Sequence, residues 1–253
     1  NGGTSLSAKT KALLLTTYDG VLNIDELLFS RSRYINLYGA VNRFIGNRYI
    51  IDKSGSQFNV AKLDNRYLSF TYNKPGDIPQ KAARIAAFSE ELSARGIDLL
   101  YVQYPFKLNK DDKQLPIGVE DFSNEASDEI LGLLRQRGVA TLDIRERIKE
   151  EKPDHYSLFF RTDHHWKPET GLWAAEKICE KLNRDNGFDI DLSKLDTRNF
   201  TSAVYENWFL GSQGKRVGQF YAGTDDFSFI LPAYDTDMAC VYRMMDGSDL
   251  IKN

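Results

Sequence analysis

The stretch Ile97-Asp-Leu-Leu-Tyr-Val-Gln-Tyr104 has the length and apolar content of a buried β-strand. It is much shorter than the roughly 20 apolar residues needed to span a bilayer. The segment before it predicts a helix, because Asp77 can cap the first turn, Pro79 suits that turn and Gly96 can end it. Apolar residues recur in this segment at helical spacing: Ala82, Ile85, Ala86, Phe88 and Leu92.

The same alternation continues after the strand. A polar loop leads to further elements whose apolar spacing predicts, in order, a helix over 124–136 stopped by Gly138, a buried strand over 139–144, a charged helix over 144–151 and an amphipathic helix over 169–182 opened by Pro168. Strands that alternate with helices indicate an α/β fold with a parallel sheet. In such sheets, active groups gather beyond the carboxyl ends of the strands.

The flanking segments are less regular. Residues 21–76 predict a helix that leads into hairpins, and the chain from Asn199 onward, rich in aromatics, glycine and aspartate, predicts loops and strands that cover a sheet or a cleft. The net charge of -3 argues against a general nucleic-acid binder, which needs a basic face. Cys179 and Cys240 lack metal-ligand spacing, and we expect two buried free thiols, with a disulfide as the alternative.

All three histidines of the chain lie within a short segment: His155, His164 and His165. Asp163 precedes His165 by two residues, so an extended backbone would point both side chains the same way and let the carboxylate orient the imidazole. The alternative is that Asp163 and the histidines are capping groups at the entry of the following helix. Zinc held by the histidines with an aspartate is a further alternative, but there is no His-x-x-x-His pattern, and we predict no metal.

Three blocks of sequence also resemble a known family. The first is Asp163-His-His-Trp166 followed by Pro168, which resembles the signature of the bacterial DHHW family and is similar to the Asp-x-His-Trp motif of alginate O-acetylation proteins. The second is Phe209-Leu-Gly-Ser-Gln-Gly-Lys-Arg-Val-Gly218, and the third is Tyr104-Pro-Phe-Lys107. The resemblance implies an SGNH-hydrolase-like α/β fold: a flavodoxin-like, three-layer parallel sheet with helices on both faces and irregular flanking hairpins and loops. It also implies that residues 31–253 form a single domain after an N-terminal segment, residues 1–30.

The resemblance assigns roles to individual residues. His165 would be the general base of a serine-histidine-aspartate triad, and Asp163 would orient it. Lys107 and Arg161 would contact substrate or, equally, form salt bridges. Ser212 would be structural or face the substrate, and Trp166 would pack at the helix entrance, with a role as a substrate platform as the alternative. No metal or nucleotide cofactor is implied.

The nucleophile is absent from its expected place. In the family, the serine follows the Asp-x-His pair in an Asp-Ser dipeptide, and no such dipeptide occurs after His165. Ser212 and Ser248 lie in blocks that resemble segments preceding the family's serine. We therefore expect the serine to lie beyond Asn253 and the domain to be incomplete at its C-terminus.

The expected function is that of an SGNH-like serine esterase or O-acetyltransferase that acts on acetyl groups of a cell-surface or secreted polysaccharide. The protein would be exported to the periplasm or the cell surface, could be tethered by an N-terminal anchor outside this chain, and could work with a membrane-bound acetyl donor protein. The alternative is a non-catalytic carbohydrate-binding or cell-envelope assembly module, with a sugar groove lined by Tyr205, Trp208, Phe220 and Tyr221.

Overall fold

The computed structural model describes residues 31–51, 59–152, 154–236, 241–243 and 249–251. Residues 1–30 and the positions of Cys240 and Ser248 lie outside this part of the chain. The helices are α2 (Arg31–Phe44), α3 (Ile78–Ser93), α4 (Ser123–Gln136), α5 (Ile144–Glu151), α6 (Pro168–Asn186), α7 (Ser212–Val217) and α8 (Gln219–Ala222), with short 3-10 turns η1 (Tyr156–Leu158), η2 (Leu192–Leu195) and η3 (Thr197–Asn199). The strands are β1 (Tyr49–Ile50), β2 (Val60–Lys62), β3 (Leu68–Phe70), β4 (Leu100–Gln103), β5 (Ala140–Asp143), β6 (Phe200–Phe209), β7 (Asp225–Pro232), β8 (Val241–Arg243) and β9 (Asp249–Ile251).

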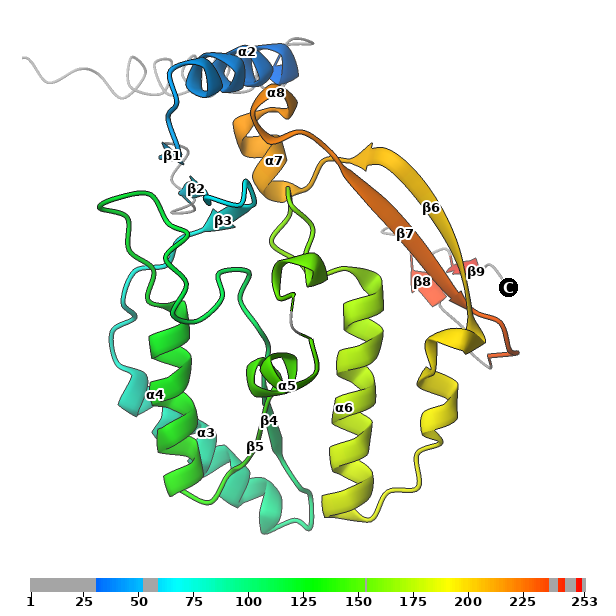
Figure 1. The fold of residues 1–253 in the computed structure, drawn as a ribbon. Coiled ribbons are helices and arrows are strands. Elements are labelled where there is room, and N and C mark those ends of the chain that lie inside the picture. Colours follow the sequence, from blue (N-terminus) through cyan, green and yellow to red (C-terminus); the bar gives the residue numbers. More distant parts are fainter. Residues whose placement is uncertain (1–30, 52–58, 153, 237–240, 244–248, 252–253) are drawn as a thin grey trace, which may run out of the picture.

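The predicted α/β unit is confirmed around one parallel pair of strands. β4 and β5 pair from Leu100 opposite Ala140 to Gln103 opposite Asp143, with α4 as the crossover (Figure 1). Successive side chains at β4 point to opposite faces of the strand. Leu99 and Tyr101 pack toward α3 and α4, whereas Leu100 and Val102 pack toward α5 and α6. Helices therefore cover both faces of this pair.

One expectation, the cap of α3, is wrong, and the expected parallel sheet is seen only in part. Asp77 adopts a left-handed conformation (φ 68°) and its side chain makes no capping hydrogen bond, so the predicted cap of α3 is wrong, although Pro79 does stand in the first turn. Parallel pairing is confined, in the described part of the chain, to β4 and β5, whereas the other pairs are antiparallel. The expected three-layer parallel sheet thus has only two of its strands here.

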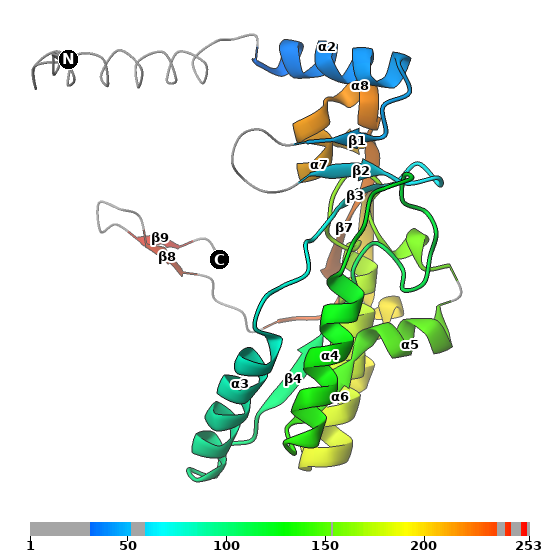
Figure 2. The ribbon, with the colours of Figure 1, turned by 90° about the vertical axis from the view of Figure 1, so that its left-hand side faces the viewer.

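A second layer of structure joins the predicted hairpins to the C-terminal part of the chain. The antiparallel strands β1, β2 and β3 pack their apolar side chains against α7 and α8, in a buried cluster of Ile50, Val60, Leu68, Phe70, Val217, Tyr221 and Ala222. α2 lies across the outer side of α8 and α7 (Figures 1 and 2). The two short helices were not predicted, because the glycine-rich block indicated only loops and strands.

The antiparallel hairpin of β6 and β7 forms a long ribbon along one side of the molecule (Figure 1). Three of its aromatic side chains are exposed, Trp208 (68%), Tyr205 (54%) and Phe229 (51%), whereas Phe200, Phe209 and Phe227 are half-buried. The end of β6 leads directly into Gly211 and α7, so the ribbon connects to the candidate site described below.

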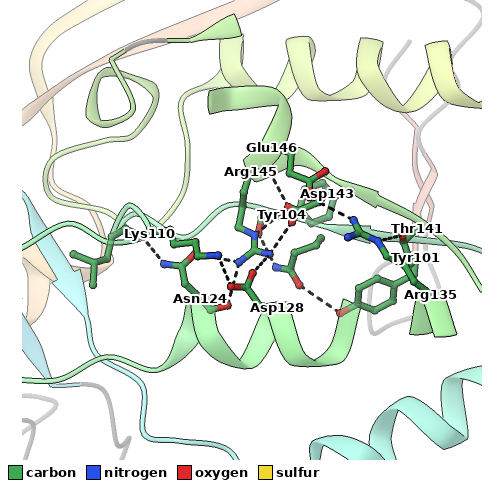
Figure 3. A network of polar contacts seen from close by, with 12 residues as sticks. Tyr101, Tyr104, Lys110, Asn124, Asp128, Arg135, Thr141, Asp143, Arg145 and Glu146 are labelled. Atoms are coloured by element: carbon green, nitrogen blue, oxygen red, sulfur yellow. Dashed lines mark hydrogen bonds and ion pairs between the residues drawn. The ribbon is translucent and has the colours of Figure 1, made fainter. Parts of the chain in front are cut away.

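A buried arginine ties the carboxyl end of β5 to the neighbouring helix. The guanidinium of Arg145 donates to both carboxylate oxygens of Asp143, at 3.0 and 2.7 Å, and to Asp128 on α4 at 2.8 Å (Figure 3). Lys110 completes the network through its 2.6 Å ion pair with Asp128. Asp143 also accepts the backbone N–H of Arg145, which caps α5 at its first turn.

Cys179 carries a free thiol on α6 and is half-buried rather than fully buried as expected. Its expected counterpart, Cys240, lies outside the described residues. No helix among the described residues combines the length and apolar content needed to cross a lipid bilayer.

The packing of α2 on α7 predicts opposite effects for two glycine substitutions. A Cβ at Gly39 would lie 2.1 Å from the backbone oxygen of Val217, whereas a Cβ at Gly132 on α4 would meet nothing within 4 Å. We expect Gly39→Ala to lower the free energy of unfolding by about 1–3 kcal/mol. Gly132→Ala should raise it by about 0.5–1 kcal/mol, because alanine favours the helix. Urea unfolding of both variants tests the pair, and a stabilising Gly39→Ala would contradict the packing.

Candidate active site

The Asp163–His165 segment is the tip of a tight loop between η1 and α6. The loop is closed by hydrogen bonds from Lys167 N to Leu158 O (2.8 Å) and from Phe160 N to His165 O (3.3 Å). Phe159 and Phe160 are buried beneath it, with exposures of 2% and 4%. Two buried aromatic side chains therefore anchor the base of the loop while its tip faces outward.

Asp163 and His165 form the predicted pair. Oδ1 of Asp163 lies 2.6 Å from Nδ1 of His165 and also accepts the backbone N–H of His165 at 2.9 Å. The aspartate is only 4% exposed, whereas the His165 side chain is 68% exposed. Since Nδ1 faces the carboxylate, the other ring nitrogen, Nε2, is the atom available for proton exchange at the surface.

The second oxygen of Asp163 connects the loop to α7. Oδ2 accepts the backbone N–H of Ser212, the first residue of that helix. Burial raises the pKa of Asp163, but the hydrogen bonds from the backbone N–H groups of Ser212 and His165 outweigh it and lower the pKa to about 2. The approach is possible because residue 211 is glycine: a Cβ there would lie 2.2 Å from the Cβ of Asp163. Asp163 is therefore a buried carboxylate that stays ionised.

Asp225 and Thr162 hold this arrangement from below, and their role was not predicted from the sequence. Asp225, at the start of β7, accepts the backbone N–H groups of Arg161 and Thr162 at 2.8 Å and the Thr162 hydroxyl at 2.6 Å. Thr162 Oγ1 in turn accepts Gly211 N–H at 2.9 Å, and Thr162 O accepts Gly214 N–H at 2.8 Å. These bonds join residues far apart in sequence, so no local pattern could have revealed them.

His164 lies beside the pair and reaches α7, whereas its position between the paired residues had predicted that it faces elsewhere. Its Nδ1 lies 2.7 Å from Ser212 Oγ and 3.5 Å from Asp163 Oδ1. The rings of His164 and His165 lie 3.7 Å apart between centroids, and Phe70 packs on the other side at 5.6 Å. His164 thus places Ser212 beside the pair and supports the His165 ring.

Lys107 lies beneath the site rather than at its surface. It is 4% exposed, and its ammonium group donates to Leu68 O (2.6 Å), Gln213 Oε1 (2.7 Å) and Arg161 O (3.3 Å). Burial lowers the pKa of Lys107 to about 7, although the charges of Asp225 and Asp163 oppose this. Because an ammonium has three donors and all three meet protein oxygens, contact with substrate would require one of these bonds to be exchanged.

Arg161 and Trp166 border the loop on its two sides. Arg161 donates from Nη2 to Thr224 O at 2.8 Å, and its Nε is buried with no hydrogen-bond partner in the described part of the chain. Trp166 is half-buried, meets the ring of Tyr104 edge-on at 5.2 Å and packs against the apolar cluster between β5 and α6. The packing of Trp166 agrees with the role expected at the helix entrance.

His155 is separate from the pair. Its Nε2 lies 3.1 Å from both Phe106 O and Lys107 O, so Nε2 carries the proton and serves the connection after β4. It also lines a cavity of about 290 Å³ near the carboxyl ends of β4 and β5, together with Arg145 and Asp128. Asp163 and His165 do not line this cavity.

A possible metal-ligand group exists among the described residues: Asp163, His164 and His165 offer ligand atoms within 4.8 Å of one another. The 2.6 Å contact between Asp163 and His165, however, is a hydrogen bond that uses the atoms a metal would need. Ligand atoms at zinc distances of about 2.0–2.2 Å in tetrahedral geometry would stand farther apart. We keep the prediction of no metal.

With this geometry in place, comparisons with known proteins identify the family. The model of the SGNH hydrolase-like domain of acetyltransferase AlgX matches residues 68–207, more than half of the chain. The chain belongs to this AlgX-type SGNH hydrolase-like family. The match includes Asp163, His165 and Trp166, and it confirms the resemblance to alginate O-acetylation proteins.

The chain spans only part of the length of the relatives it matches. It is 29% identical over 138 residues to the alginate biosynthesis protein AlgX of Pseudomonas aeruginosa, and this alignment covers 51% of the chain and 29% of AlgX. Bacillus cereus PatB1 (TM-score 0.59, 17% identity) and the O-acetyltransferase domain of Pseudomonas putida AlgJ (TM-score 0.54, 17% identity) share the fold. They match 76% and 68% of this chain, respectively, and 65% of each solved chain. A DHHW family protein from Eubacterium siraeum is also similar (TM-score 0.49, 16% identity), over 73% of this chain and 57% of its own.

The low pKa of Asp163 predicts how stability depends on pH. Since the folded-state pKa is about 2, below the ordinary range near 4, the stabilisation is fully present above pH 4 and is lost as the pH falls through about 2. When the pH is lowered from 5 to 2, the free energy of unfolding should therefore fall by about 2 kcal/mol less in Asp163→Asn than in the wild type. Urea unfolding across this range measures the difference. Equal losses in the two proteins would contradict the geometry.

Proposed function

We propose that this protein is an SGNH-like serine esterase or O-acetyltransferase that acts on acetyl groups of a polysaccharide. One observation carries the proposal: a buried, ionised Asp163 holds Nδ1 of His165 at 2.6 Å while the His165 side chain remains 68% exposed. This arrangement suits a general base, because the carboxylate fixes the tautomer and stabilises the imidazolium that forms. Membership of the AlgX-type family supports acetyl transfer as the reaction class.

In the proposed mechanism, His165 Nε2 takes the proton of a serine hydroxyl as the serine oxygen attacks the acetyl carbonyl. The tetrahedral intermediate then collapses, the bond from the acetyl carbon to the leaving group breaks, and His165 returns its proton to that leaving group. The leaving group is the sugar oxygen in an esterase and belongs to the donor protein in a transferase, and an acetyl-serine remains in both cases. Water releases it as acetate in an esterase, whereas a sugar hydroxyl accepts it in a transferase, with His165 as the base in either case.

The serine of this mechanism is proposed to lie outside the described residues. The hydroxyl of Ser212 lies beside the pair, but it contacts His164 rather than His165, and the backbone N–H of Ser212 binds Asp163. The prediction of a serine beyond Asn253 is part of the proposal, as is the three-layer parallel sheet.

The remaining candidate residues have two kinds of role in this proposal. Ser212 and Trp166 are partly exposed beside the pair and are retained as candidate substrate contacts. Arg161 is retained because an acceptor oxygen would satisfy its buried Nε. Lys107, which is buried, would position the loop and α7 around the site.

The proposed substrate class follows the names of the relatives. AlgX is named as an alginate biosynthesis protein, and AlgJ contains an O-acetyltransferase domain. We propose an exported protein that meets a polysaccharide in the periplasm or at the cell surface and receives acetyl groups from a membrane-bound donor protein.

A carbohydrate-binding module of the same fold is the second candidate. The exposed rings of Tyr205 and Trp208, 5.8 Å apart on β6, favour it, because flat aromatic faces can stack on sugar rings. This function would require no turnover. Binding that persists in His165→Ala, without acetyl release by the wild type, would favour it over the enzyme.

Acetyl release from an O-acetylated polysaccharide by the full-length gene product tests the enzyme proposal. We expect His165→Ala to lower kcat by about 10²–10⁴-fold, since it removes the base. Asp163→Ala should lower it comparably, whereas His155→Ala, whose ring binds the connection after β4, should retain most of the activity. Adding a deacetylated acceptor distinguishes a transferase from an esterase. Equal activity in the wild type and His165→Ala would contradict the proposal.

A further inference from the structure

Helix α2 presents an apolar face that nothing in the described part of the protein covers. Its exposed side chains recur at helical spacing and include Phe44 (91% exposed), Tyr34 (66%) and Leu37 (61%). The complete set, called here the α2 stripe, is Tyr34, Leu37, Tyr38, Val41, Phe44 and the adjacent Ile45. Such a contiguous apolar surface on a small domain indicates an interaction site.

The opposite side of α2 holds it firmly to the protein. Gly39 and Asn42 are buried there, and a Cβ at Gly39 would meet the backbone of α7. Arg43 donates to Phe220 O at 3.1 Å, and Asn36 accepts the backbone N–H of Gln219 at 2.7 Å. Figure 2 shows α2 at one end of the molecule with α8 on its inner side, so the stripe faces away from the body.

The charge of α2 indicates what the stripe contacts. The helix contains three arginines and no acidic residue. Arg31 lies seven residues before Tyr38, and Arg33 lies four residues before Leu37, so the two arginines fall at opposite margins of the stripe. An apolar face with arginines along its margins is typical of helices that lie in the interface of an anionic membrane.

A basic cavity near the C-terminal end of α2 adds positive charge to this end of the molecule, although Arg43 places it on the packed side of the helix rather than on the stripe. This cavity of about 360 Å³ is lined by four basic side chains, from Arg43, Arg48, Lys62 and Arg66, against one acidic side chain, Asp64, among the described residues. Arg48 pairs with Asp64 at 2.7 Å, which leaves an excess of positive charge. Burial and the charges of Arg43 and Arg66 lower the pKa of Lys62, and a bound anion would relieve this repulsion.

We propose that α2 docks on the surface of an anionic lipid bilayer. The α2 stripe would enter the boundary between headgroups and acyl chains, and Arg31 and Arg33 would contact lipid phosphates at its margins. This inference is independent of the proposed chemistry, because it concerns only where the protein sits.

Docking would bring the candidate active site close to the membrane. α2 packs on α7, and α7 begins at Ser212, whose N–H binds Asp163. A helix of this length rises only about 9 Å. The pair of Asp163 and His165 would thus be separated from the docked face by roughly the length of α7 and the thickness of α2, which is about 10 Å.

Vesicle co-sedimentation of the full chain tests the proposal. We expect binding to vesicles of phosphatidylglycerol and phosphatidylcholine in equal parts, weaker binding at high salt, and little binding to phosphatidylcholine alone. The double variant Leu37→Ser with Phe44→Ser should bind at least about tenfold more weakly. Arg31→Gln and Arg33→Gln should each weaken vesicle binding about fivefold.

Matched controls stand at sites far from α2 in sequence. Ile117→Ser removes a fully exposed apolar side chain (106% exposed), and Arg95→Gln removes an exposed arginine at the end of α3. Both should bind as the wild type does, and thermal unfolding should show that every variant is folded. The proposal would be overturned by a wild type that does not bind, by equal binding to the two kinds of vesicle, or by α2 variants that bind normally. Self-association of the protein that is lost in the Leu37 and Phe44 variant would assign the stripe to a second copy instead and would also overturn it.

Discussion

The carboxylate of Asp163 is the interaction on which the site depends. One oxygen holds both the ring and the backbone of His165, and the other binds the first N–H of α7. A buried carboxylate is stable only when such donors compensate for its lost hydration, and here they do so well enough to keep it ionised. The same bonds join the loop before α6 to the end of β6, so the group that orients the base also holds two distant parts of the chain together.

The surrounding residues make that approach possible. Because residue 211 is glycine, it has no Cβ that would collide with Asp163. Asp225 binds the backbone N–H of Thr162, the residue before Asp163, and the Thr162 hydroxyl in turn accepts the N–H of Gly211. Lys107 balances this group of acids from below, with all of its donors bound to protein oxygens. Its burial gives the Pro-x-Lys block a structural explanation. α7 continues from this centre to the packed side of α2, so the base of the proposed membrane-docking face and the site share one short helix.

The sequence predicted those features that depend on interactions between residues close together in the chain. The apolar periodicity located α3, α4, α5, α6 and the parallel strands β4 and β5, and the two-residue spacing of Asp163 and His165 predicted their contact. Three features escaped because they depend on distant contacts or on backbone conformation. Asp225 supports the site although it lies 62 residues after Asp163 in the sequence. The helices α7 and α8 form in a glycine-rich block. Asp77 adopts a left-handed conformation and therefore does not cap α3.

The central claim is that Asp163 holds His165 with its proton on Nδ1, leaving Nε2 to exchange protons. Nitrogen-15 NMR of the imidazole rings tests it most directly, and a chain with three histidines gives only three sets of ring signals. The account predicts that neutral His165 is the Nδ1–H tautomer and that Asp163→Asn disturbs it, while His155 is the Nε2–H tautomer because two carbonyls accept from that atom. A neutral His165 protonated on Nε2 in the wild type would contradict the account.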